Sequence, residues 1–145
     1  MEEIDRAAFQ SFYLKNIDRT QQNFKPQHEK IYKRLIAIVE QNKSGCFFAV
    51  KDTDENIQAA LLLLHHQTRL INIINVASAE GKKSGASHFL FSGVIQQNAG
   101  QNKLFDFEGS SVSSIAKFYE GFGAQPENFW LYETNIFRKL SQRFS

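Results

Sequence analysis

The chain has 145 residues, of which 42% are hydrophobic and fourteen are phenylalanine, so it is long and apolar enough for one folded domain and is not a disordered segment. Its formal net charge of +2 is too small to indicate nucleic acid or an anionic membrane as the main partner. The longest apolar run, Ala59–Leu64, is too short to span a membrane, and the acidic start MEEIDRAAFQ does not resemble a signal peptide. A single cysteine, Cys46, excludes an internal disulfide and suits a reducing compartment, so we expect a cytoplasmic protein. The small net charge and the short apolar runs predict no DNA partner and no membrane insertion.

Two helices are predicted in the first 44 residues. Apolar residues at helical spacing predict a helix from Ile4 to about Phe24, and no strand is expected before it. The pair Lys25-Pro26 interrupts this pattern, and Pro26 suits the first turn of a second helix that runs to about Asn42.

The pattern then changes to strands. Ile57–His65 is apolar on both faces, which predicts a central strand of a sheet. A polar loop precedes it and a short turn follows it, so its neighbours along the chain should pair with it as an antiparallel meander. The three predicted strands are Cys46–Lys51, Ile57–His65 and Arg69–Val76. The small, polar stretch Ala77–Ser87 is predicted to be a loop that leads into a helix from about Gly85 to Gln97.

The stretch from Leu104 to Pro126 predicts a strand, a tight turn and a short amphipathic helix. The strand Leu104–Glu108 places two carboxylates, Asp106 and Glu108, on one face. Either Ser110 or Ser111 is a candidate helix cap, and the glycines that end the helix are Gly121 and Gly123. A last strand, Phe129–Thr134, and a short helix over Asn135–Ser145 complete an α+β fold, in which a βαβ crossover follows the antiparallel meander and helices cover both faces of the sheet.

The first candidate site is the glycine-containing loop before the predicted helix at Gly85. Unpaired amides and the positive end of the helix dipole suit a phosphate group, and Lys82 and Lys83 add positive charge. The pattern Lys82-x-x-Gly85-x-Ser87 matches neither the P-loop nor the dinucleotide fingerprint. A plain solvent-exposed loop is an equally good interpretation of the composition.

The carboxylates and the tyrosine of the later stretch are further candidates. Glu108, near the carboxyl end of a parallel strand, is placed to act as a general base. It would otherwise order the turn that follows, whereas Asp106 is interpreted as a structural group that pairs with a backbone or Lys/Arg group. Tyr119 could donate a proton into a cleft or be a half-buried aromatic residue with its hydroxyl in water. Adjacent His65 and His66 would point to opposite faces of a strand, so no metal site is expected.

The order strand, helix, FYEGFGA, strand resembles the carboxyl-terminal part of the Gcn5-related N-acetyltransferase (GNAT) superfamily. Within this superfamily, the segment FDFEGSSVSSIAKFYEGFGAQP resembles most the branch related to the Fem-type peptidoglycan-bridge aminoacyl transferases. The resemblance covers about Gly45–Thr134. It implies a GNAT-like mixed sheet of about five strands, in which Arg69–Val76 and Leu104–Glu108 splay apart to admit the arm of acetyl-CoA or another acyl-CoA.

The resemblance also implies roles for individual residues. It places the pyrophosphate on Lys82-x-x-Gly85-x-Ser87, where lysine replaces the family's glutamine or arginine and serine replaces its last glycine or alanine. Tyr119 takes the place of the tyrosine that protonates the leaving thiolate. No glutamate is present on Arg69–Val76, so Glu108 is the replacement expected as base. The residues expected to bind the acyl-CoA are Val76, Ala77, Ser78, Lys82, Lys83, Ser84, Gly85, Ala86 and Ser87.

Three functions follow as hypotheses. The first is an acyl-CoA-dependent N-acyltransferase acting on a small-molecule or peptide amine. The second is a Fem-like lobe for aminoacyl or peptidoglycan-linked transfer in a bacterial protein, and the third is a non-catalytic GNAT-like domain. We expect one domain over residues 1–145, made of a helical part (1–44), a sheet core (45–134) and a tail (135–145). A homodimer and a pairing with a second GNAT-like lobe of a longer protein are both compatible with this organisation.

Overall fold

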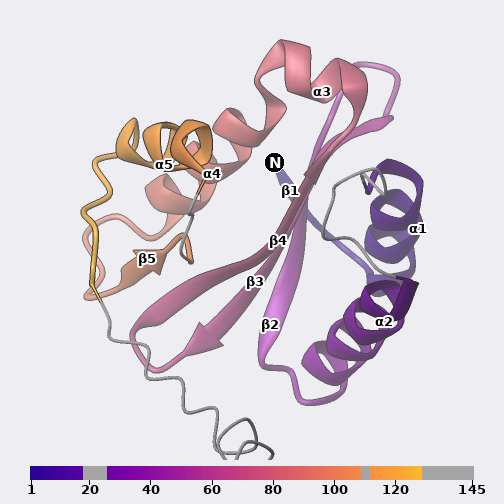
Figure 1. Cartoon of the computed structure of the whole chain (residues 1–145), viewed down its shortest axis with the longest axis horizontal. Coiled ribbons are helices and arrows are strands. Elements are labelled where there is room, and N and C mark those ends of the chain that lie inside the picture. The colour runs from indigo at the N-terminus through magenta and orange to yellow at the C-terminus, as the bar shows by residue number, and fades with distance from the viewer. Residues whose placement is uncertain (18–25, 109–111, 129–145) are drawn as a thin grey trace, which may run out of the picture.

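The computed structural model describes residues 1–17, 26–108 and 112–128 (Figure 1). These residues form one mixed sheet with helices on both faces, which confirms the predicted α+β class. In chain order the elements are β1 (Glu2–Ile4), α1 (Arg6–Asn16), α2 (Pro26–Gln41), β2 (Gly45–Lys51), β3 (Ile57–His66), β4 (Arg69–Ala77), α3 (Ala79–Ser84), α4 (Ala86–Gln97), β5 (Leu104–Asp106) and α5 (Ser113–Glu120). Within the described ranges, no helix is both long and apolar enough to cross a membrane.

The strands lie side by side in the order β1-β2-β3-β4-β5. Neighbours are antiparallel from β1 to β4, and β5 runs parallel to β4 after the crossover through α3 and α4. The central strand is β3, as its apolar run predicted, and its residues Ala59–Leu63 are buried. The run AALLLL forms a strand despite its helix-forming residues because burial on both faces favours the centre of a sheet.

Two hydrophobic clusters fill the two faces of the sheet. Helices α1 and α2 cover one face and α4 and α5 cover the other, as Figure 1 shows. On the first face the fully buried side chains include Phe9, Ile36 and Leu62. On the second face, Leu90 and Phe91 of α4 pack on Leu61 and Leu63 of β3, and aromatic side chains of β5 and α5 complete the cluster.

The chain opens with a strand, so the prediction of a helix from Ile4 with no strand before it was wrong. Ile4 pairs with Phe47 in β1, and α1 begins at Arg6 after Asp5, whose carboxylate accepts a hydrogen bond from the Ala8 N–H at 2.7 Å. A three-residue strand has no alternation of its own, and backbone bonds to β2 form it. Of the predicted helix, residues 18–24 lie outside the described part of the chain.

The predicted loop Ala77–Ser87 was also wrong in part, because it contains the helix α3. The Ser78 hydroxyl accepts a hydrogen bond from the Gly81 N–H at 2.8 Å and caps this helix. Gly81 is buried against β3, where a Cβ would lie 2.0 Å from the carbonyl oxygen of Gln58. The glycine, which disfavours a helix by propensity, is therefore required by close packing on the sheet.

The stretch after α4 is a strand, a turn and a helix, with shifted boundaries. Pairing in β5 ends at Asp106, and α5 begins after Val112. The cap predicted at Ser110 or Ser111 therefore does not stand next to the first helical residue, and both serines lie outside the described residues. The glycines that follow α5 are Gly121 at its end and Gly123 with φ of 79°, as expected for a helix stop. The predicted strand Phe129–Thr134 and helix Asn135–Ser145 also lie outside the described residues.

Candidate active site

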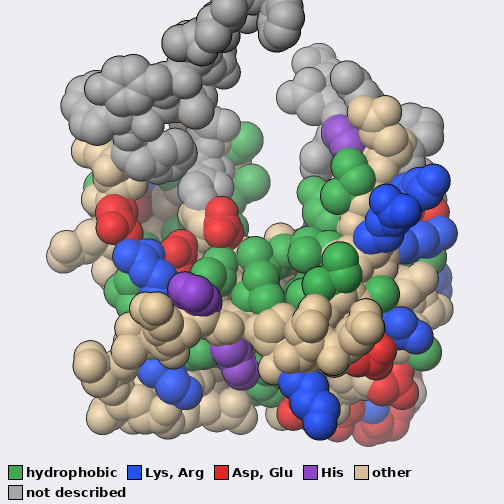
Figure 2. Space-filling model, turned by 90° about the horizontal axis from the view of Figure 1, so that it is seen from below, with side chains coloured by type: hydrophobic (Ala, Val, Ile, Leu, Met, Phe, Trp, Pro, Cys, Tyr) green, Lys and Arg blue, Asp and Glu red, His purple; other side chains and the backbone are tan. Residues whose placement is uncertain are grey.

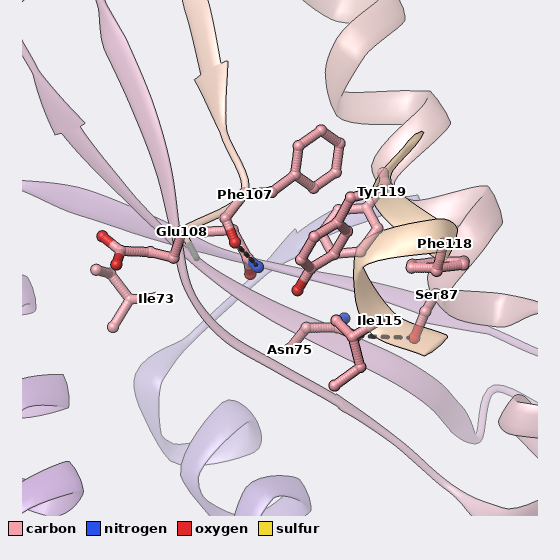
Figure 3. A pocket seen from close by; sticks show the side chains of 10 residues that line it. Ile73, Asn75, Ser87, Phe107, Glu108, Ile115, Phe118 and Tyr119 are labelled. Carbon is pink, nitrogen blue, oxygen red and sulfur yellow. Dashed lines mark hydrogen bonds between the residues drawn. The ribbon is translucent and has the colours of Figure 1, made fainter. Parts of the chain in front are cut away.

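The parallel strands β4 and β5 pair at one end only. Three residue pairs join them, Arg69 with Leu104, Leu70 with Phe105 and Ile71 with Asp106, and the pairing stops there. Beyond this point a pocket of about 380 Å³ opens between the diverging strands. Its lining comes from β4, α4, α5 and the residues after β5, so the carboxyl end of β5 lies at the pocket as expected for a parallel strand (Figure 3).

A β-bulge in β4 contributes to this divergence. Leu62 pairs with Ile74 and Leu63 pairs with Asn72, so Ile73 has no partner on β3. The extra residue shifts the alternation of side chains and strengthens the local twist. As a result Leu70 packs in the cluster under α4, whereas Ile74 packs in the cluster under α1 and α2.

Tyr119 of α5 reaches the pocket with its hydroxyl group (Figure 3). Its ring stacks on Phe107, with ring centroids 4.6 Å apart and an interplanar angle of 28°. Burial raises the pKa of Tyr119, and a hydrogen bond from the Asn72 side chain partly opposes that rise. The hydroxyl therefore stays protonated at neutral pH and is able to donate.

Glu108 lines the same pocket and lies two residues after the end of β5. Its backbone has φ of 59°, a left-handed conformation that costs free energy for a residue with a side chain. Asp106 stabilises this turn, because its Oδ1 accepts the Glu108 N–H at 2.9 Å while its Oδ2 accepts from Arg69 at 2.9 Å. Asp106 thus has the structural role that was predicted for it.

Asn72 of β4 is the buried polar side chain of this region. It is only 6% exposed, and its Nδ2 donates to the carbonyl oxygen of Phe107 at 3.3 Å across the gap between the strands. Its Oδ1 has no hydrogen-bond partner within the described residues. No role was predicted for Asn72 from the sequence. A single polar residue at an inward position of an apolar strand was the signal that could have found it.

The start of α4 lies beside β4 and is shaped by Gly85. This glycine has φ of 72°, ends α3 and precedes α4, and no side chain caps the first amides of α4. A Cβ on Gly85 would meet nothing within 4 Å among the residues that the structure describes, so no described group crowds this glycine. Ser87 in the first turn donates to Asn75 Oδ1 at 3.0 Å, which ties α4 to β4. Lys82 and Lys83 are exposed in the last turn of α3, so positive charge lies near an anion-compatible helix end.

A second, wider pocket of about 650 Å³ adjoins the first one. Both pockets share Ile73, Asn75, Ser87 and Ile115, so they meet along β4. The second pocket extends past the carboxyl end of β4 to α1 and α2, and the aromatic and polar side chains that line it there are Tyr13, Asn16, His28 and Tyr32. Figure 2 shows a face of the molecule whose middle is lined by hydrophobic side chains, with charged side chains gathered toward its edges.

The structure brings some of the predicted site residues to the pockets and not others. Glu108, Tyr119 and Ser87 line the first pocket, and Val76, Ala77 and Lys82 line the second. Ser78 is engaged elsewhere, since its N–H donates to the Gln58 carbonyl and its hydroxyl donates to Gln58 Oε1. Ala86 is buried in the core under α4. The remaining predicted binding residues, which line neither pocket, are Lys83, Ser84 and Gly85.

The histidines and the cysteine offer no competing site. His65 and Cys46 are in contact, with Nε2 and Sγ 3.5 Å apart. Burial raises the pKa of the Cys46 thiol to about 11, so the thiolate needed for nucleophilic attack is scarce at neutral pH. Among the residues that the structure describes, no group of three His, Cys, Asp or Glu side chains could hold a metal ion.

Comparison of the structure with solved proteins identifies the fold. It is similar to a possible acetyltransferase from Clostridium difficile 630, with 11% identity over 93% of this chain and 95% of that one and a TM-score of 0.65. It is also similar to glucosamine-6-phosphate N-acetyltransferase from Arabidopsis thaliana, with 8% identity over 92% and 96% of the two chains and a TM-score of 0.61. A transcriptional regulator from Bacillus halodurans has 13% identity, covers 92% and 97%, and has a TM-score of 0.65.

The chain therefore has the GNAT fold, with a five-stranded mixed sheet, as the resemblance in sequence implied. No protein-family model matches the sequence, and no curated protein matches it either. Identities this low establish the fold and leave the chemistry to be argued from the pockets.

Proposed function

We propose that this protein is an acyl-CoA-dependent N-acyltransferase, with acetyl-CoA as the expected donor. The observation that carries the proposal is the pocket where β4 and β5 diverge, because it brings Tyr119 and Glu108 to one cavity within a GNAT fold. Solved structures with this fold include N-acetyltransferases, which supports transfer to an amine. Fold similarity alone would not distinguish an enzyme from the regulator that shares it, so the site residues are the basis of the proposal.

The residues around α4 fit the anionic end of an acyl-CoA. The uncapped start of α4 at Gly85 and Ser87 offers backbone amides, and Lys82 and Lys83 supply positive charge for a pyrophosphate. Ser84 and Ala86 flank Gly85 and belong to the same proposed binding segment. The acyl-CoA supplies a thioester, and its carbonyl would be oriented by the amide of Ala77, which points away from β3. The Ser78 N–H is already bonded to Gln58, and the Val76 N–H, two residues earlier on the strand, faces β3 in the same way.

The side chains of the first pocket have complementary roles in the proposed reaction. Glu108 acts as general base and removes a proton from the acceptor amine, directly or through a water molecule. The amine nitrogen attacks the thioester carbonyl, the C–S bond breaks, and Tyr119 donates its hydroxyl proton to the departing sulfur. Holding the two reactants together contributes most of the remaining rate enhancement.

The acceptor is proposed to be a small-molecule amine. Structural neighbours include an aminoglycoside antibiotic 6'-N-acetyltransferase from Acinetobacter baumannii and the glucosamine-6-phosphate enzyme, whose names denote small amine substrates. The former covers 93% of this chain and 97% of its own, with 11% identity and a TM-score of 0.58. The second pocket, which opens toward α1 and α2, is the proposed place for this acceptor.

Binding of acetyl-CoA tests the proposal directly. A ligand at about 100 times its dissociation constant should stabilise the folded chain by about 2.7 kcal/mol, which thermal unfolding detects readily. The control ligand is pantetheine, which lacks the pyrophosphate and should stabilise the folded chain less than acetyl-CoA does. Absence of any shift at millimolar acetyl-CoA would refute the proposal, and binding without transfer to any of a panel of amines would favour a non-catalytic GNAT-like domain. A Fem-like lobe would instead bind charged tRNA or a muropeptide.

A further inference from the structure

Asn72 occupies an unusual position for a carboxamide. It lies at an inward-facing position of β4, immediately before the bulged residue Ile73, and is almost fully buried. Its immediate surroundings in the pocket are aromatic, with Phe91, Phe107 and Tyr119. An amide in such surroundings loses its hydration, so each of its polar atoms needs a partner within the protein.

Only half of the Asn72 side chain has such partners among the described residues. The Nδ2 group donates to the Phe107 carbonyl at 3.3 Å, and this bond fixes which end of the amide faces β5. The Oδ1 atom is buried and has no partner within residues 1–17, 26–108 and 112–128. An unsatisfied buried acceptor lowers the free energy of unfolding, and an apolar side chain of similar size would avoid that loss. Packing alone therefore does not account for asparagine at this position.

Among the described residues the Asn72 amide nitrogen makes one printed bond, to the Phe107 carbonyl, so its second hydrogen is available to Tyr119, which lines the same pocket. The ring of Tyr119 is held in place by stacking on Phe107, the residue whose carbonyl binds the same amide nitrogen. Asn72, Phe107 and Tyr119 thus form a connected unit that spans β4, the end of β5 and α5 along one wall of the pocket. When the oxygen of a hydroxyl accepts a hydrogen bond from an amide, its own proton is left free to donate elsewhere.

We propose that Asn72 is a positioning residue for Tyr119: its amide nitrogen joins the Phe107 carbonyl to the Tyr119 hydroxyl oxygen and directs the hydroxyl proton into the pocket. This inference rests on the proposed function for the use of that proton. The amide also offsets part of the effect of burial on the pKa of Tyr119 and so makes the hydroxyl a better proton donor.

Other charged groups near Tyr119 must be considered in any titration. Glu108 lines the same pocket from the end of β5. On α4 the nearest titratable group is His88, which packs on Phe118 and Phe122 of the α5 region. From β4 the pocket receives the uncharged side chains of Asn72, Ile73 and Asn75.

The first experiment measures the ionisation of Tyr119 without any acyl-CoA. Tyrosine ring carbons are labelled, the Tyr119 signal is assigned with Tyr119→Phe, and its titration midpoint is compared in the wild type and in Asn72→Leu. We expect an upward shift of the midpoint in Asn72→Leu because a hydrogen bond to the phenolate form is lost. Asn75→Leu is the matched control, since it makes the same change on the same strand and in the same pocket. The signal of Tyr32, on the other face of the sheet, is the internal reference.

The comparison of the two variants distinguishes the loss of a hydrogen bond to Tyr119 from a general decrease in the hydration of the pocket. A shift in Asn72→Leu that is absent from Asn75→Leu supports the proposal, whereas an unchanged midpoint or an equal shift in both variants overturns it. If leucine at position 72 prevents folding, Asn72→Ala is measured in the same way. Because no turnover is involved, this measurement decides the inference even if the protein proves not to be an acyltransferase.

A second experiment uses the transfer reaction in a double-mutant cycle. Asn72→Leu should lower kcat on the order of tenfold in the wild-type background, a part of the roughly 10²- to 10⁴-fold that general acid catalysis contributes. In the Tyr119→Phe background the same substitution should have almost no further effect, because the hydroxyl that Asn72 positions is gone. Equal losses in the two backgrounds would show that Asn72 acts independently of Tyr119 and would contradict the proposal.

Discussion

The guanidinium of Arg69 donates to the carboxylate of Asp106 at 2.9 Å and joins the first residue of β4 to the last paired residue of β5. The other oxygen of Asp106 accepts the N–H of Glu108. Arg69 also pairs with Glu127 at 3.1 Å. The closed end of the parallel pair is therefore held by side-chain interactions, and the strands are free to diverge only on the other side of it.

Removing the carboxylate of Asp106 should weaken both the strand pair and the turn at Glu108. We expect Asp106→Ala to lower the free energy of unfolding by about 1–2 kcal/mol, the sum of a partly exposed ion pair and one hydrogen bond. Urea unfolding measures this loss. Asp106→Asn retains an acceptor for the Glu108 N–H and loses the charge, so it should lose less; a loss as large as that of alanine would show that the charge alone matters.

Glu108 is predicted to be the general base. Glu108→Gln keeps the size and the polarity of the side chain but cannot take a proton, so kcat/KM for acyl transfer should fall by about 10²- to 10⁴-fold. The control is Glu120→Gln, which makes the same change on an exposed residue of α5. Binding of acetyl-CoA should be nearly unchanged in both variants. Turnover of Glu108→Gln at the wild-type rate would remove this residue from the mechanism and spare the fold.

Gly85 offers a test that separates backbone strain from ligand binding. Gly85 and Gly100 both have positive φ, 72° and 76°, and a Cβ on either would meet no atom of the described part of the chain within 4 Å. Substitution by alanine should lower the free energy of unfolding by a similar amount at each position, about 1–2 kcal/mol. Only Gly85→Ala should also weaken acetyl-CoA binding, measured by calorimetry. Equal affinity in the two variants would place the pyrophosphate elsewhere.

Alkaline pH should destabilise the protein, in part through Cys46. Burial, and secondarily the charge of Glu3, raises the pKa of its thiol from 9.0 to about 11. A group whose pKa is higher in the folded state binds protons more tightly there, so its contribution to stability is present below pH 9.0 and is lost as the pH rises through about 11. The hydrogen bonds of Lys51 to Glu2 and Glu55 raise its pKa and act in the same direction at higher pH.

The variant Cys46→Ala isolates this contribution. Its free energy of unfolding should fall less steeply than that of the wild type between pH 9 and 11, because no thiol is left to ionise. The measurement is a series of urea unfolding curves across this range. Parallel pH dependences in the two proteins would mean that ionisation of the thiol is not coupled to folding.

Much of the sheet could be predicted from composition. The strand β3 contains an apolar run typical of burial on both faces, and β4 is rich in β-branched residues. The strand β1 could not be predicted, since Glu2–Ile4 carries no alternation and exists only through its bonds to β2. Helix α3 was not predicted because its glycine, Gly81, has a low helix propensity. The glycine is present because a side chain at this position would collide with the carbonyl oxygen of Gln58. Such features depend on contacts distant in sequence, and a local pattern contains no information on them.

The candidate site was accessible to sequence reasoning to a smaller degree. Glu108 and Tyr119 were candidates from their positions and residue types, and the family resemblance assigned their roles. Both line one pocket in the structure. Asn72 was not singled out, because its significance depends on the bulge at Ile73 and on the approach of Phe107. The same bulge decides which face each residue of INIIN occupies, and a regular alternation that is right before Ile73 would have assigned the residues after it to the wrong faces.

The attachment of β5 to the sheet has a consequence for how the pocket opens and closes. Eight residue pairs join β4 to β3, but three join it to β5, and no residue of α5 is fully buried. The pocket wall that carries Tyr119 and Glu108 should therefore have the lowest free energy of local opening in the described fold. Its amides should exchange with solvent through local opening while β2, β3 and β4 exchange only on global unfolding. A ligand that bridges the diverging strands would act as their missing cross-link and slow exchange most in β5 and α5.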